Sequence, residues 1–182
     1  MERDPARNLE DRVIQTLQLL RDWGQAASAE QLSEVLIGGD IDTEVLRSLL
    51  RSMKGIVLED GIVGLEGSLH LIPKTKSRLA THRALESTYL EVAKEFTEEF
   101  LRWCPLVHSV ALSGSLSNGG FEEGDDIDFD LVVRPGTRYA SYLMAILLGL
   151  RYAWRYRNRE VNEVHRTPLL PKITCVNVVW SE

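Results

Sequence analysis

The strongest constraint on this chain is a short run in which acidic and apolar residues alternate. Asp126, Asp128 and Asp130 are separated by Ile127 and Phe129. Because successive side chains of a β-strand point to opposite faces, this period of two predicts a strand with one acidic and one apolar face. Two such carboxylates about 5 Å apart repel by roughly 3 kcal/mol at an effective dielectric near 20. Divalent cations would remove that cost, although a solvated acidic face also fits the pattern.

A glycine-serine turn precedes the acidic run. Gly114 and Ser115 lie at the end of residues 107–114, which read as a short buried strand. Such a turn can offer backbone N–H groups and a hydroxyl to phosphate oxygens, and it can equally be a plain connection. Beside a metal-binding strand it predicts a triphosphate site in which Mg²⁺ bridges the phosphates.

The two features together resemble a known signature. Gly114-Ser115 followed after ten residues by Asp126-Ile127-Asp128 resembles the nucleotidyltransferase superfamily related to DNA polymerase beta, over roughly residues 107–180. The resemblance implies that Gly114 and Ser115 contact the phosphates of an NTP and that Asp126 and Asp128 bind Mg²⁺, with Mn²⁺ as an alternative. It also implies transfer of a nucleoside monophosphate to a hydroxyl of an unknown acceptor, which could be RNA, a protein or a small molecule. The whole layout is similar to uncharacterised bacterial and archaeal nucleotidyltransferase-like proteins.

The chain departs from this pattern at two places. Asp125 stands where the family often has serine, and the later strand that usually supplies a third carboxylate offers Asn177. Asp130 and Glu182 are the two candidates for the third carboxylate, and it could also be missing. Its absence would remove the expected general base while leaving nucleotide binding intact.

Basic residues near the end of a predicted helix are candidates for a triphosphate or acceptor clamp. They also suit the helix dipole, and a solvated basic end is the ordinary interpretation. The cluster comprises Arg151, Arg155, Arg157 and Arg159, with Lys172 and Arg134 as weaker candidates.

The order of predicted elements gives an α/β (α+β) chain of two parts. Residues 1–75 read as three helices and a hairpin around Asp60-Gly61, which is the order of a winged-helix-like module. Residues 76–105 read as a long linking helix, and residues 106–182 as a nucleotidyltransferase-type mixed-sheet core. Within that core we expect residues 140–157 to form a mostly buried helix and 173–180 a strand. Packing roles are expected for His108, Trp154, Trp180 and both cysteines.

Composition limits the kinds of binding partner that are expected for this chain. The net charge is −6, and residues 1–75 carry eight Lys/Arg against thirteen Asp/Glu, so DNA binding by this part is not expected. Protein contact or a homodimer is the expected role. Two cysteines without a C-x-x-C pattern and a polar N-terminus favour a cytoplasmic protein. The longest apolar run, 142–150, is too short to span a membrane.

Two alternative functions remain open from the sequence. One is a non-catalytic regulator that senses a nucleotide or binds a protein through a degenerate nucleotidyltransferase core. The other is a glycosyltransferase that uses a D-x-D motif, a nucleotide sugar and Mn²⁺. The upstream glycine-serine turn and the short core argue against the second.

Overall fold

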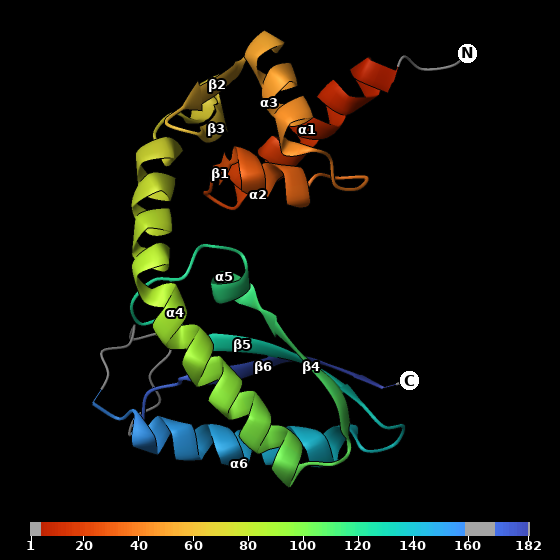
Figure 1. The fold of residues 1–182 in the computed structure, drawn as a ribbon, viewed down its shortest axis with the longest axis vertical. Coiled ribbons are helices and arrows are strands. Elements are labelled where there is room, and N and C mark those ends of the chain that lie inside the picture. Colours follow the sequence, from red (N-terminus) through yellow and green to blue (C-terminus); the bar gives the residue numbers. More distant parts are fainter. Residues whose placement is uncertain (1–4, 159–169, 182) are drawn as a thin grey trace. The chain divides into compact units, whose positions relative to one another are not determined.

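The computed structural model describes residues 5–158 and 170–181 of the chain (Figure 1). It is a mixed α/β structure with two three-stranded sheets, which confirms the expected class. The chain divides into two compact units, with the boundary between Arg78 and Leu79. Among the described residues, no helix is long and apolar enough to cross a membrane.

The N-terminal unit combines three helices with an antiparallel sheet of strand order β1-β3-β2. Its elements are α1 (Pro5–Asp22), β1 (Ala27–Ser28), α2 (Ala29–Glu34), α3 (Thr43–Ser52), β2 (Ile56–Glu59), β3 (Ile62–Leu65) and a 3-10 turn (Glu66–Ser68). The two-residue strand β1 and the 3-10 turn are the elements of this unit that the sequence pattern did not predict. Leu32, Leu46 and Val63 are fully buried at the centre of this unit.

Local sequence signals explain the boundaries in this unit. Ser28 caps α2 in a reciprocal capping box with Gln31, and Asp42 accepts hydrogen bonds from the first N–H groups of α3. The hairpin between β2 and β3 turns at Asp60 and Gly61, whose φ angles of 51° and 81° are both positive. A two-residue hairpin turn of this type requires positive φ at both positions, which the Asp-Gly pair tolerates.

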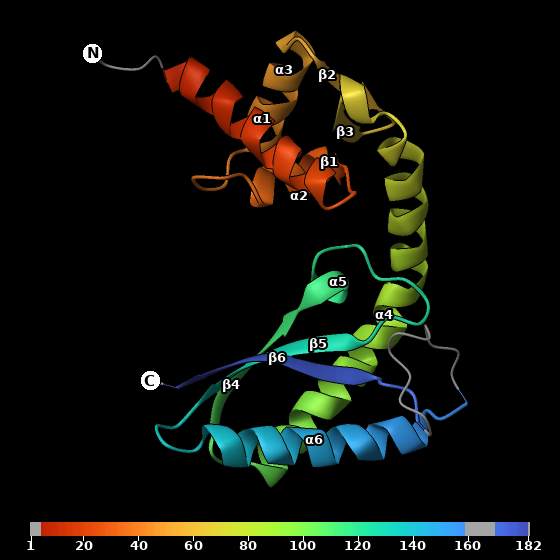
Figure 2. The same ribbon diagram turned by 180° about the vertical axis from the view of Figure 1, so that it is seen from behind.

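The C-terminal unit is built on a mixed sheet of strand order β4-β5-β6. Strand β5 is central; β4 pairs with it antiparallel and β6 pairs with it parallel. Both views place α4 and α6 on one face of this sheet and the short α5 on the other (Figures 1 and 2). The elements are α4 (Leu71–Trp103), which begins before the unit boundary, β4 (Val107–Ser113), α5 (Gly114–Ser117), β5 (Ile127–Val133), α6 (Arg138–Arg155) and β6 (Thr174–Ser181).

The apolar face of β5 forms the centre of this unit. Its alternate residues Ile127, Phe129, Leu131 and Val133 are at most 1% exposed, as the alternation predicted. Phe129 stacks on Phe96 of α4 with ring centroids 4.8 Å apart. The apolar face of β5 is therefore fixed against the helices, and its acidic residues are turned to the opposite face.

Several packing predictions for this unit are wrong. Val107 is the only buried residue of strand β4, because the sheet has three strands and β4 lies at its edge, and His108 is exposed. Trp154 and Trp180 are 63% and 61% exposed. Helix α6 packs against the sheet along one side only, so its opposite side is not buried.

Candidate functional site

The acidic residues lie on the face of the β4-β5-β6 sheet that α4 and α6 do not cover. Residues directly opposite each other on neighbouring strands point to the same face. The register therefore places three rows of side chains on this open face: Ser113, Asp128 and Cys175; then Ala111, Asp130 and Val178; then Ser109, Val132 and Trp180. We call this surface the open sheet face.

Three potential metal ligands converge at the first row. One ligand atom from each of Asp126, Asp128 and Cys175 lies within 4.8 Å of the others. Asp126 is 7% exposed and precedes β5, which begins at Ile127, so it is held by the loop and not by the regular strand. Asp130 lies one row further along the sheet and is not part of this group. Its Oδ1 atom is buried without a hydrogen-bond partner in the described structure.

Gly114 brings the glycine-serine turn into direct contact with the acidic strand. Its φ angle is +68°, and a methyl group added at this position would lie 2.0 Å from Oδ2 and 2.9 Å from Cβ of Asp128. A left-handed φ and the absence of space both select glycine here. The two halves of the motif, separated in sequence by the loop 116–125, are therefore one packed unit.

Asp125, the residue before the acidic pair, organises this loop. The Ser115 hydroxyl donates to Asp125 Oδ2 at 2.9 Å, and the Glu122 N–H donates to the same oxygen at 3.1 Å. The Ser115 hydroxyl, predicted to meet phosphate, thus has an internal acceptor in this structure. Asp125 closes the loop onto the turn as a hydrogen-bond acceptor.

The same loop is anchored to α4 from the other side. Phe121 is fully buried, and its ring centroid lies 4.6 Å from that of Tyr89. Its backbone N–H donates to Nδ1 of His82, which is itself 6% exposed. The sequence does not indicate that His82 anchors this loop, because a single histidine inside a helical pattern looks like any other partly buried residue.

Strand β6 and the short segment before it contribute partners that the motif does not contain. Lys172 Nζ lies 2.7 Å from Oδ2 of Asp126, and the Asn177 side chain hydrogen-bonds to Asp128. Cys175 Sγ donates to Asn177 Oδ1 at 3.4 Å. The expected burial of Cys175 is wrong: it is only partly buried and faces the acidic residues, whereas Cys104 is buried as expected.

A bulge in β6 places Asn177 beside the acidic group. Phe129 pairs with Val176 and Asp130 pairs with Val178, so Asn177 is an extra residue with no opposite partner on β5. Bulges re-aim side chains and are frequent next to functional sites. The bulge thus brings an amide, and not a carboxylate, next to Asp128.

The negative charges of the acidic group are partly balanced by a lysine. Burial, and then the nearby charge of Asp126, raise the pKa of Asp128. Burial also raises the pKa of Cys175, which favours the neutral thiol. Burial acts to lower the pKa of Lys172, but its hydrogen bonds to Asp126 and Cys175 outweigh this and raise it. Lys172 therefore supplies a permanent positive charge against the two carboxylates.

These donors fit a divalent cation in part. The carboxylate oxygens of Asp126 and Asp128 are ligands that Mg²⁺ and Mn²⁺ prefer, whereas the sulfur of Cys175 suits softer ions such as Zn²⁺. Lys172 already contacts Asp126, so a cation would share or displace that contact. The described residues offer two carboxylates here and no third one within the group.

Of the predicted basic residues, Lys172 joins this group, whereas Arg151 and Arg155 have other partners. Arg151 and Arg155 pair with Glu99 and Glu95 of α4, which lies with α6 on the covered face of the sheet. The structure thus gives these two arginines acidic partners within the helix layer. Arg159 and Glu182, also named as candidates, lie outside the described residues.

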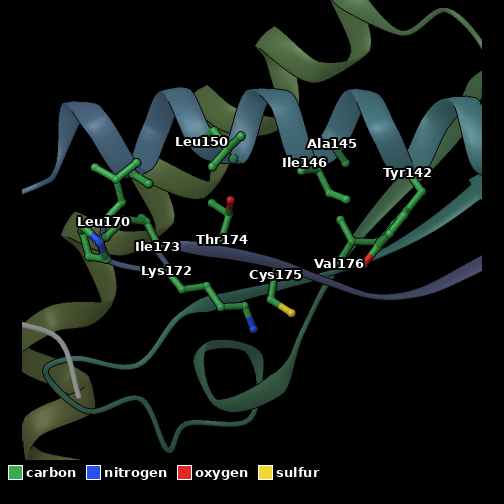
Figure 3. Close-up of a pocket in the computed structure, with 13 residues that line it drawn as sticks. Tyr142, Ala145, Ile146, Leu150, Leu170, Lys172, Ile173, Thr174, Cys175 and Val176 are labelled. Atoms are coloured by element: carbon green, nitrogen blue, oxygen red, sulfur yellow. The ribbon is translucent and has the colours of Figure 1, made fainter. Parts of the chain in front are cut away.

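A pocket of about 260 Å³ lies between α6 and the start of β6 (Figure 3). Its lining is mostly apolar and includes Tyr142, Ile146 and Leu150 of α6. The side chains of Lys172 and Cys175 at its edge point away from α6 (Figure 3). The pocket therefore lies between the helix and the start of β6, and it shares Lys172 and Cys175 with the acidic group.

Comparisons of the chain with protein-family models, with curated proteins and with solved structures gave no match.

Proposed function

We propose that the C-terminal unit is a nucleotidyltransferase-type core that binds an NTP with a divalent cation on the open sheet face. The observation that supports this most strongly is the contact between Gly114 and Asp128, which leaves no room for a Cβ atom. A glycine-serine turn and an acidic strand could each be incidental, but their direct packing is what a shared triphosphate and metal site requires.

The reaction would transfer a nucleoside monophosphate from the NTP to an acceptor hydroxyl, with release of pyrophosphate. Asp126 and Asp128 would hold Mg²⁺ or Mn²⁺, which when bound neutralises charge on the phosphates. Gly114 and Ser115 would line the phosphate side of the site. Asp130 is the remaining carboxylate on the open sheet face, and its buried, unsatisfied Oδ1 is available as an acceptor for a bound group.

The N-terminal unit is proposed to be a winged-helix-like module with a protein partner. Its order of helices followed by a β-hairpin supports the first part. Of the two arginines of α3, Arg47 is already paired with Glu30 and Glu44, so Arg51 is the other positive charge that this helix could offer to DNA phosphates.

One set of contacts favours a second candidate, a nucleotide sensor without catalysis. Asn177 occupies the place next to Asp128 where a third carboxylate would be expected, and an amide cannot act as a general base. Lys172 also covers Asp126 and lowers the negative charge available to a second cation. Binding of a nucleotide with one cation would survive both features.

Equilibrium binding tests the site itself. We expect the wild-type chain to bind Mg²⁺-ATP or Mg²⁺-GTP in titration calorimetry, and the Asp126→Asn/Asp128→Asn variant to lose this binding. Glu123→Gln is the matched control, because it removes one exposed acidic charge from the same loop. Equal nucleotide affinity in the wild type and the double variant would rule out the assigned site.

Turnover separates the two candidates. Labelled NTPs are incubated with RNA, protein and small-molecule acceptors, using the wild type and Asn177→Asp, which restores a carboxylate. Product from the wild type identifies a transferase. Product from Asn177→Asp alone, with nucleotide binding by both proteins, identifies a sensor whose site lost its base.

A further inference from the structure

The outer side of helix α6 is an apolar surface. Every exposed residue from Tyr139 to Leu150 is aliphatic or aromatic. We call this surface the outer face of α6. Its large side chains are each between 42% and 87% exposed: Tyr139, Tyr142, Leu143, Ile146, Leu147, Leu150 and Trp154. Three of them, Tyr142, Ile146 and Leu150, lie at the edge of this face, because they also line the pocket between α6 and β6.

The opposite side of α6 is packed in the ordinary way. Ser141, Ala145, Leu148 and Tyr152, spaced three or four residues apart, are buried against the sheet and α4. Helix α6 is therefore apolar around most of its circumference. A helix of that kind is normally buried on all sides. One side of α6 packs against its own chain, and the other side carries apolar side chains that are equally suited to burial.

The size of the outer face fits a stable association. A large aromatic side chain buries about 150–250 Å² when fully covered. Seven large side chains that are each about half exposed therefore present an area of several hundred Å², approaching the ~800 Å² that each partner contributes to a typical stable interface. The largest apolar patch of an ordinary monomer is about 300–600 Å².

The charges beside the outer face are already engaged. Arg151 and Arg155 are paired with Glu99 and Glu95 of α4, and Arg138 donates to the Ser181 hydroxyl. Helix α6 contains no acidic residue. The face therefore offers no strong charge pattern for recognising a highly charged partner or an anionic lipid headgroup.

We propose that the outer face of α6 is the contact surface between two copies of this chain. An uncharged apolar helix face is complementary to itself, as a two-fold symmetric interface requires. An antiparallel arrangement centred near Ile146 and Leu147 would set the Tyr139 end of one helix beside the Trp154 end of the other. It would also oppose the two helix dipoles. This proposal is independent of the nucleotide site and is tested without nucleotide.

The main test measures mass in solution. Sedimentation and light scattering of the full chain, over a wide range of micromolar concentrations, should give the mass of two 20.6 kDa chains. Leu143→Glu/Leu147→Glu should raise the dissociation constant roughly tenfold or more, since central apolar contacts dominate such interfaces. Val45→Glu is the matched control, because Val45 is a similarly exposed apolar residue on α3.

A second measurement guards against misfolding of the double variant. In a Cys175→Ser background, Ile146→Cys should form a disulfide between two chains on mild oxidation, while Val45→Cys should not. Circular dichroism of the double variant should match the wild type, because both leucines are exposed in the single chain.

Three results would overturn the proposal. The first is a wild-type chain that stays monomeric at every concentration. The second is a dimer that is unaffected by Leu143→Glu/Leu147→Glu. The third is sedimentation of the wild type, but not the double variant, with phosphatidylcholine-phosphatidylserine vesicles, which would assign the outer face to a membrane surface.

Discussion

Replacing Gly114 by alanine tests the contact on which the proposed site depends. Alanine must adopt a left-handed φ of +68°, which costs about 1–2 kcal/mol. Its methyl group must also displace Asp128, whose Oδ2 and Cβ would lie 2.0 and 2.9 Å away. Rotation of the carboxylate clears the oxygen but not the Cβ atom, so overpacking adds about 1–3 kcal/mol. The expected loss is therefore about 2–5 kcal/mol.

Gly136→Ala separates these two costs. Gly136 has a φ of +76° and open space where its Cβ would be, so alanine there has the backbone cost alone. We expect Gly114→Ala to be more destabilising than Gly136→Ala by about 1–3 kcal/mol. Urea unfolding followed by tryptophan fluorescence measures both, in a Trp23→Phe background that restricts the signal to the C-terminal unit.

A double-mutant cycle completes the test. Asp128→Ala removes the carboxylate, so it should recover part of the loss caused by Gly114→Ala, with a coupling of about 0.5–3 kcal/mol. Equal losses at Gly114 and Gly136, together with no coupling to Asp128, would refute the claim that the turn and the acidic strand are packed as one unit.

Three further predictions concern neighbouring side chains. Asp128→Asn should raise Tm at neutral pH but not near pH 4, which is about the unfolded carboxyl pKa of ~3.9. The raised pKa of Asp128 means that the native state holds the proton more tightly than the unfolded chain does. The ionised carboxylate therefore destabilises the native state at neutral pH, and asparagine removes that charge. A Tm difference that did not change with pH would contradict this. Phe121→Ala should cost about 3–5 kcal/mol in urea unfolding, since it empties a fully buried site; a loss below about 1 kcal/mol would show that the loop is not anchored there. Arg155→Ala should change stability by less than about 1 kcal/mol and leave the calorimetric affinity for Mg²⁺-ATP unchanged; a clear loss of affinity would support the clamp role that the sequence suggested.

Local patterns predicted much of the fold. The alternation after Asp126 gave the buried face of β5, and Ser28, Asp42 and the Asp60-Gly61 pair marked helix starts and a hairpin that the structure contains. Each of these signals acts between residues close in sequence, so one sequence suffices to detect it. The contact of Gly114 with Asp128 spans fourteen positions, and only the resemblance to a known signature suggested it.

Long-range partners could not be predicted in the same way. Lys172, Cys175 and Asn177 reach the acidic residues because β6 pairs in parallel with β5, and no local pattern sets that register. Exposure was mispredicted for a related reason. An apolar pattern shows that α6 is suited to burial on both sides. It does not show whether residues of the same chain pack against both sides.

The bulge in β6 has a genetic consequence. Asn177 is the one residue of this strand that can be removed while every other pair between β5 and β6 keeps its partner, because Val176 and Val178 already oppose consecutive residues of β5. Loss of a single codon would therefore yield a regular ladder and take away only the amide beside Asp128. The chemistry of this corner could be gained or lost in one evolutionary step without rebuilding the sheet.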